Sequence, residues 1–159
     1  MTIQIRNLVP AALLATVMFT TTAVHAEGYM GKVCLLSTVT ARETGPVTES
    51  PVVVTYDTNF LGGGAYALSG SVNIPGQPYI FTGYGNQIGN ILYMNITSTQ
   101  LHPDPDNWHD AAVQQAKLNL ATMTGTFYEI GHNFNPKLSG TQQWNESYTA
   151  GTITKTPCP

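Results

Sequence analysis

Apolar and polar side chains alternate along most of the chain, and this alternation is typical of half-buried β-strands. The clearest case is the stretch 90–98, where Leu92, Met94 and Ile96 share one face of an extended chain while the intervening side chains share the other. Residues 52–56 form a continuous β-branched run, which indicates a central or fully buried strand. The pattern therefore predicts a β-protein.

Turn-forming residues interrupt these runs at roughly ten-residue intervals, which favours an antiparallel sandwich or barrel. The runs with strand character number about eight. They cover residues 29–39, 52–56, 65–71, 79–82, 90–98, 116–121, 124–130 and 144–154.

Two cysteines, Cys34 and Cys158, favour the barrel over the sandwich. In an oxidising compartment they are expected to form a disulfide. The first and last strands of an up-and-down barrel pair with each other, so a bridge between these two positions would hold that seam together. We therefore predict a single antiparallel up-and-down β-barrel of about eight strands, with a β-sandwich as the alternative. The two Cα atoms should lie within about 4.4–6.8 Å.

Residues 102–110 interrupt the alternation. Two prolines exclude a strand there, and Asp106 or Asn107 can cap a helix. Trp108 and the small or polar residues that follow could line one face of a short helix. We therefore expect one short helix near residues 106–115.

The N-terminus predicts export. Arg6 precedes an apolar run over residues 8–19, and Val24-His25-Ala26 suits signal peptidase. We expect a signal peptide over residues 1–26, a single β-barrel domain over 27–159, and a periplasmic or extracellular location. The apolar run is shorter than the roughly 20 residues that a membrane helix needs. No second run reaches that length, so we expect no membrane span in the mature chain.

Composition excludes nucleic acid as a partner and agrees with export. The net charge is −3, and the six Lys and Arg residues are scattered singly, whereas binding to phosphates needs them clustered. Only 9% of the residues are charged, well below the usual quarter. Uncharged polar residues replace them, as is common in exported β-proteins.

One polar cluster could bind a metal, although its spacing matches no established site. It lacks the central glycine and the twelfth-position glutamate of a calcium loop, so a helix-capping loop is the favoured interpretation. The weak metal candidates are His102, Asp104, Asp106, His109 and Asp110. A metal-dependent enzyme rests on this cluster as an unfavoured alternative.

Catalytic motifs are missing from the sequence. There is no G-x-S-x-G nucleophile motif, and a carboxylate pair formed by Glu129 and Glu146 has nothing in the sequence to set its separation. We assign no catalytic residue, expect no cofactor and favour a non-enzymatic function.

Aromatic residues on the middle strands suggest a binding site at the barrel mouth, although they could equally pack across strands. The candidate ligand-binding residues are Tyr66, Tyr79, Tyr84, Tyr93 and Trp108. We therefore expect an exported β-barrel protein that binds a small apolar or amphipathic ligand.

A protein-binding module, either an enzyme inhibitor or a cell-surface component, is the alternative function, and its loops would carry recognition. The expected architecture resembles calycin-type barrels and small periplasmic barrel inhibitors. This resemblance is one of fold only and assigns no residue a role.

Overall fold

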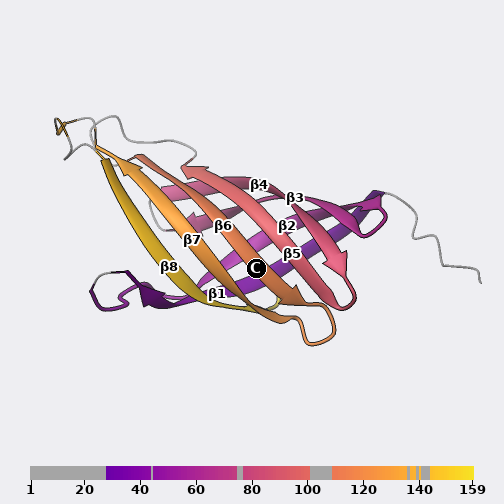
Figure 1. The fold of residues 1–159 in the computed structure, drawn as a ribbon. Helices are drawn as coiled ribbons and strands as arrows, with labels where there is room; N and C mark the ends of the chain where they lie inside the picture. The colour runs from indigo at the N-terminus through magenta and orange to yellow at the C-terminus, as the bar shows by residue number, and fades with distance from the viewer. Residues whose placement is uncertain are drawn as a thin grey trace, which may run out of the picture.

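Eight antiparallel strands of the computed structural model follow one another in chain order and close into a barrel (Figure 1). The structure describes residues 28–43, 45–74, 77–100, 109–135, 137–138, 140 and 144–159. The strands are β1 (Gly28–Arg42), β2 (Val52–Gly62), β3 (Ala65–Ile74), β4 (Gln77–Ile88), β5 (Ile91–Gln100), β6 (His109–Asn119), β7 (Thr124–Phe134) and β8 (Trp144–Lys155). The prediction of a closed up-and-down barrel is confirmed.

The helix predicted near residues 106–115 is wrong over 109–115, because these residues form the first half of β6. This strand pairs with β5 on one side and β7 on the other, so its backbone bonds are taken up by the sheet. Residues 106–108, like the predicted signal peptide over 1–26, lie outside the described residues. Within the described ranges, no helix is long and apolar enough to cross a membrane.

Strand β1 closes the barrel because it is long enough to pair on both sides. Its residues 28–37 pair with β2, and its residues 35–42 pair with β8. The register shifts between Tyr29 and Gly31 and again between Val39 and Ala41. Such irregularities bend a strand and increase its twist, which lets β1 curve from one neighbour to the other.

The predicted disulfide joins Cys34 of β1 to Cys158, with 5.2 Å between the Cα atoms. The tail that follows β8 turns back over β1, and the Thr156 backbone N–H donates to the Cys34 carbonyl oxygen at 3.0 Å. Cys34 lies on the outer face next to Thr55 of β2, yet it is only 1% exposed because the tail covers it. The bridge therefore holds the β1–β8 seam from outside.

The two ends of the barrel differ in their connections. At one end, here called the hairpin end, tight turns join β2 to β3, β4 to β5 and β6 to β7. At the other, the loop end, lie the connections that follow β1, β3, β5 and β7. Inward side chains are apolar toward the hairpin end and through the middle of the barrel, where they form one buried cluster. Toward the loop end they become polar.

Inward glycines make room for the large rings of this cluster. A Cβ atom placed on Gly151 would meet the Thr38 carbonyl oxygen and would lie 2.6 Å from Cε1 of Phe127. Small residues opposite large ones are how a narrow barrel fills its interior.

Gly151→Ala is therefore expected to lower the free energy of unfolding by about 1–3 kcal/mol, because the methyl group would clash with the Thr38 carbonyl oxygen and overpack against the Phe127 ring. Gly131→Ala is the matched control on β7, since its Cβ would meet only Ser147, first at the movable Oγ atom. Urea unfolding of both variants measures the difference. Equal losses would show that the contacts with Thr38 and Phe127 are not what requires glycine at position 151.

Candidate functional site

A cavity of about 290 Å³ lies inside the barrel at the loop end. One wall is polar and comes mainly from β6, β7 and β8. This polar wall consists of Tyr79, Asp110, Gln114, Glu129, Asn133 and Ser147. The facing wall is apolar and comes from β2 and β3. This valine wall consists of Val52, Val54 and Val72.

The order of the strands explains why the two walls face each other. In a closed ring of eight strands, β2 lies opposite β6 and β3 lies opposite β7. The lining residues of β2 and β3 are valines, whereas the polar lining residues of β6 and β7 are two amides and two carboxylates. The cavity therefore presents an apolar surface to one side of a bound molecule and a hydrogen-bonding surface to the other.

Tyr79 and Asp110 form a hydrogen bond that crosses one strand. The Tyr79 hydroxyl donates to Oδ2 of Asp110 at 2.7 Å. The two residues lie on β4 and β6, so the hydrogen bond spans the intervening strand β5, whose Ser98 also lines the cavity. Burial raises the pKa of Tyr79, and the hydrogen bond to Asp110 raises it further. Tyr79 thus remains a neutral donor at any physiological pH.

Glu129 is the more deeply placed carboxylate. Its Oε2 accepts a hydrogen bond from Nε2 of Gln114, directly opposite on β6, at 3.3 Å. Burial raises the pKa of Glu129, and the Gln114 bond opposes that shift only in part. Because the folded protein binds this proton more tightly than the unfolded chain does, the contribution of Glu129 to stability falls as the pH rises through its pKa. Ionised Glu129 is therefore costly in the empty cavity.

An ion pair lies among the residues that line the cavity on the β1 side. Nη1 of Arg42 is 3.0 Å from Oε1 of Glu49, and both side chains are about one-third exposed. A pair so exposed adds little stability. Its two charges compensate each other, so the acidic character of the cavity comes from Asp110 and Glu129.

A second cavity of about 230 Å³ lies toward the hairpin end and is almost entirely apolar. Strand β5 shows how the two are separated: Leu92 and Met94 line the second cavity, Ser98 lines the first, and Ile96 between them lines neither. Ile96 belongs to the buried cluster. The cluster therefore divides the interior into an apolar chamber and an amphipathic one.

The predicted ligand-binding residues do not form one site. Tyr79 lines the loop-end cavity, whereas Tyr66 lines the hairpin-end cavity, where its hydroxyl donates to Gln87 at 2.9 Å. Tyr84 and Tyr93 lie on the outer face, 57% and 39% exposed. Trp108 lies outside the described residues. The structure thus supports an interior position for two of the five.

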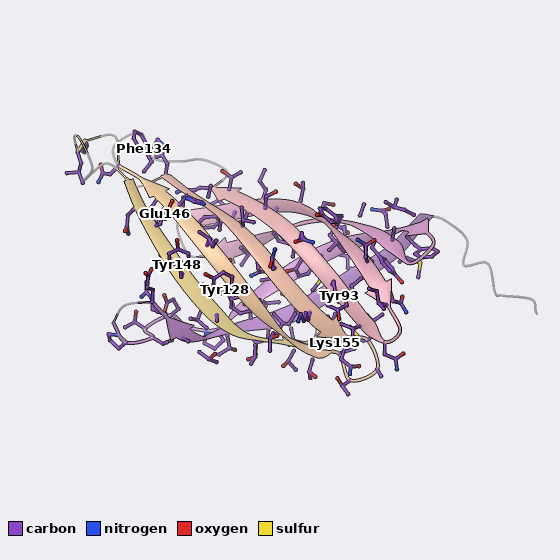
Figure 2. All side chains as sticks on the ribbon, in the orientation of Figure 1. Tyr93, Tyr128, Phe134, Glu146, Tyr148 and Lys155 are labelled. Atoms are coloured by element: carbon purple, nitrogen blue, oxygen red, sulfur yellow. A yellow bond between two sulfur atoms is a disulfide. The ribbon has the colours of Figure 1, made fainter. Side chains whose placement is uncertain are left out.

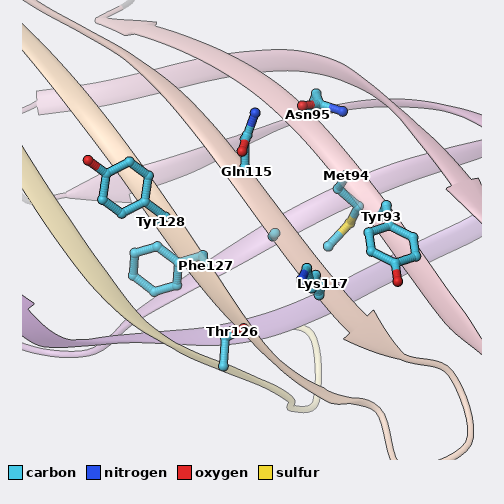
Figure 3. Close-up of a pocket in the computed structure, with 9 residues that line it drawn as sticks. Tyr93, Met94, Asn95, Gln115, Lys117, Thr126, Phe127 and Tyr128 are labelled. Atoms are coloured by element: carbon cyan, nitrogen blue, oxygen red, sulfur yellow. The ribbon is translucent and has the colours of Figure 1, made fainter.

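The outer tyrosines pack across strands, as the alternative interpretation allowed. Nζ of Lys117 lies 5.7 Å from the ring centroid of Tyr93, beside a depression over β5, β6 and β7 (Figure 3). The rings of Tyr128 and Tyr148 stack with centroids 6.3 Å apart on the same outer wall (Figure 2). These contacts cover the sheet and do not enclose a pocket inside the barrel.

The metal candidates are also separated where the structure describes them. His109 faces outward, with its ring centroid 6.0 Å from that of Phe134, whereas Asp110 faces the cavity. His102, Asp104 and Asp106 lie outside the described residues. No group of three metal-ligating side chains occurs within the described ranges.

The two carboxylates considered as a pair from the sequence lie on opposite faces of the barrel wall. Glu129 faces the interior, whereas Glu146 faces outward and lies 3.5 Å from Nδ1 of His132. These two glutamates therefore cannot act on one glycosidic bond.

Sequence reasoning missed Gln114 and the role of Glu129 in the polar wall. The signal was present in the sequence, because Glu129 shares one face of its strand with Phe127 and Gly131. A carboxylate on the apolar side of a strand indicates a cavity or a buried polar contact. No protein-family model matches the chain, and comparisons with curated proteins and with solved structures also find no match.

Proposed function

We propose that the protein is an exported β-barrel that binds a small amphipathic ligand in the loop-end cavity. The observation that carries this proposal is the opposition of the valine wall and the polar wall in one cavity. Ligand sites are typically apolar concavities with a few well-placed polar groups. This cavity has that composition, whereas the hairpin-end cavity lacks the polar part.

The dimensions restrict the ligand to a small molecule. A volume of about 290 Å³ lies at the lower limit of typical ligand pockets, which span roughly 300–1,000 Å³. The valine wall favours an alkyl group by about 25 cal/mol for each Å² of apolar surface removed from water. The polar wall then fixes the orientation of the other end.

Export is proposed from the disulfide and the composition together. A disulfide of this kind persists in oxidising compartments, and the low charge content agrees with an exported β-protein.

Ala112→Leu tests the site because Ala112 lines the cavity from β6. The added isopropyl group should occupy part of the cavity and weaken binding. Hexanol serves as the amphiphile, and ¹H–¹⁵N chemical-shift perturbation follows its binding. In the wild type, we expect saturable shifts at Val54, Val72 and Ala112, and smaller shifts at these positions in the variant.

Val113→Leu is the control, because the neighbouring side chain is 45% exposed on the outer face. It should bind hexanol like the wild type. The proposal would be contradicted if hexanol shifted only outer residues such as Tyr93 and Tyr128, or if Ala112→Leu bound hexanol as the wild type does.

A further inference from the structure

We infer that the loop-end cavity selects a cationic amphiphile, namely a primary ammonium carried on a short alkyl chain. This inference rests on the proposed function and specifies the ligand head group. The cavity is acidic, its hydrogen bonds point at carboxylates, and one buried acceptor beside it has no partner among the described residues.

The described residues that line the cavity give it a net negative charge. Asp110 and Glu129 both lie in the polar wall, and the one cation that lines the cavity, Arg42, is held at 3.0 Å by Glu49. A bound anion would therefore meet two carboxylates with no uncompensated cation among the described lining residues. A bound cation would gain attraction that is stronger inside the barrel than in water.

The hydrogen bonds of Tyr79 and Gln114 point at the two carboxylates of the polar wall. The Tyr79 hydroxyl donates to Asp110, and the Gln114 amide donates to Glu129. The donors that these pairs contain are thus directed at carboxylates of the same wall. Each ionised carboxylate offers about four lone-pair sites, so Asp110 and Glu129 can accept more hydrogen bonds than Tyr79 and Gln114 donate to them, and a ligand that brings donors is favoured.

Gln100 provides an independent observation, a buried acceptor beside the polar wall. Its side chain is only 8% exposed, and its Oε1 atom has no hydrogen-bond partner among the described residues. It lies directly opposite Tyr79 in the register of β4 and β5, and therefore on the inward face of the barrel beside the polar wall. A buried acceptor without a partner is costly. Gln100 does not itself line the cavity, but the partial negative charge of this oxygen beside the polar wall adds to the attraction for a cation.

A primary ammonium satisfies these conditions together, because it carries three donors, one positive charge and no acceptor. The attached alkyl chain would lie against the valine wall. A neutral alcohol matches the two walls but supplies one donor and no charge. A carboxylate of the same length matches the valine wall alone.

The protonation state of Glu129 should make the binding of an ammonium depend on pH. An ammonium favours the ionised carboxylate, whereas burial favours the protonated form, so affinity should rise with pH through the acidic range. The titratable or charged groups that share this interior with Glu129 are Arg42, Glu49, Tyr56, Tyr79 and Asp110. The pKa values of Tyr56 and Tyr79 are raised, so neither tyrosine ionises in that range.

The experiment compares hexylammonium, hexanol and hexanoate by isothermal titration calorimetry on the oxidised protein. We expect hexylammonium to bind about ten- to hundredfold more tightly than hexanol, and hexanoate to bind more weakly than either. Hexylammonium affinity should increase as the pH rises through the acidic range, because the pKa of Glu129 is raised by burial. Equal or weaker binding of hexylammonium than of hexanol would overturn the inference and leave the proposed function standing. Failure of all three to bind would overturn both.

Glu129→Gln tests the assignment to this cavity. We expect it to weaken hexylammonium binding about ten- to hundredfold, to change hexanol binding much less and to abolish the pH dependence. Glu146→Gln removes the same charge from the outer face and should change none of these. A ¹H–¹⁵N spectrum with native dispersion shows that each variant is folded. If the two variants weakened hexylammonium equally, net charge and not the cavity would account for selectivity, and the inference would fail.

Discussion

Cys158→Ser is expected to lower the free energy of unfolding by about 4–5 kcal/mol, because the disulfide closes a loop of 124 residues in the unfolded chain. Such a loss is a large part of the 5–15 kcal/mol typical of a folded domain. Position 158 is the better one to change, since Cys158 is exposed whereas Cys34 is buried beneath the tail. The variant thus opens the loop and leaves the packing around Cys34 in place.

Urea unfolding followed by fluorescence measures this loss by linear extrapolation. Reduced wild-type protein is the control, because it opens the same loop without a substitution and should lose the same amount. Cys34→Ser should lose more, since it also places a hydroxyl at the buried position. If reduction and Cys158→Ser both left the unfolding midpoint unchanged, the bridge would not be constraining the unfolded chain.

Phe127→Ala is expected to lower the free energy of unfolding by about 3–5 kcal/mol, as truncation of buried aromatic side chains does. Phe127 is only 5% exposed, belongs to the buried cluster and also lines the loop-end cavity. The glycine at position 151 leaves space for this ring and carries no side chain that could fill the hole. The cavity left behind should therefore collapse only partly.

Phe127→Leu is the matched control, because it keeps most of the volume and should cost less than about 1.5 kcal/mol. The alanine variant should also bind octanol more tightly than the wild type does, since the loop-end cavity is extended toward the middle of the barrel. A loss below about 1 kcal/mol for Phe127→Ala would mean that the neighbouring side chains close the space.

The barrel could be predicted from the sequence because alternation and closure leave local signals. Leu92, Met94 and Ile96 share the interior as their spacing indicates. The cysteine pair places the first strand beside the tail of the last. Together these observations favoured an up-and-down barrel over a sandwich.

The β6 strand was misassigned because its composition is that of a helix. Alanine and glutamine favour helices when considered alone, and the pairing with β5 and β7 overrides this preference. The period of two was nevertheless present, since Ala112, Gln114 and Ala116 face inward while their neighbours are exposed. Small inward residues weaken an alternation that depends on large apolar side chains.

The site was only partly predictable, because its walls come from opposite sides of the ring. Tyr79 was identified from its chemistry, but its partner Asp110 was assigned to a metal cluster through its sequence neighbours. Side chains alternate between the two faces of each strand, and this alternation places Tyr84 and Tyr93 outside the barrel. Their aromatic character alone does not distinguish an inward from an outward position. Which wall faces which depends on the strand order of the closed barrel.

The separate origin of the two walls has a consequence for changing specificity. The valine wall comes from β2 and β3, and the carboxylates come from β6 and β7. Substitutions at sites that share no partner usually have additive effects. The preferred tail length and the preferred head-group charge of the ligand should therefore be adjustable independently. Substitution of Val54 should change the tail length, and substitution of Glu129 should change the head-group charge. The specificity of a double variant should then follow from the summed effects of its two single substitutions.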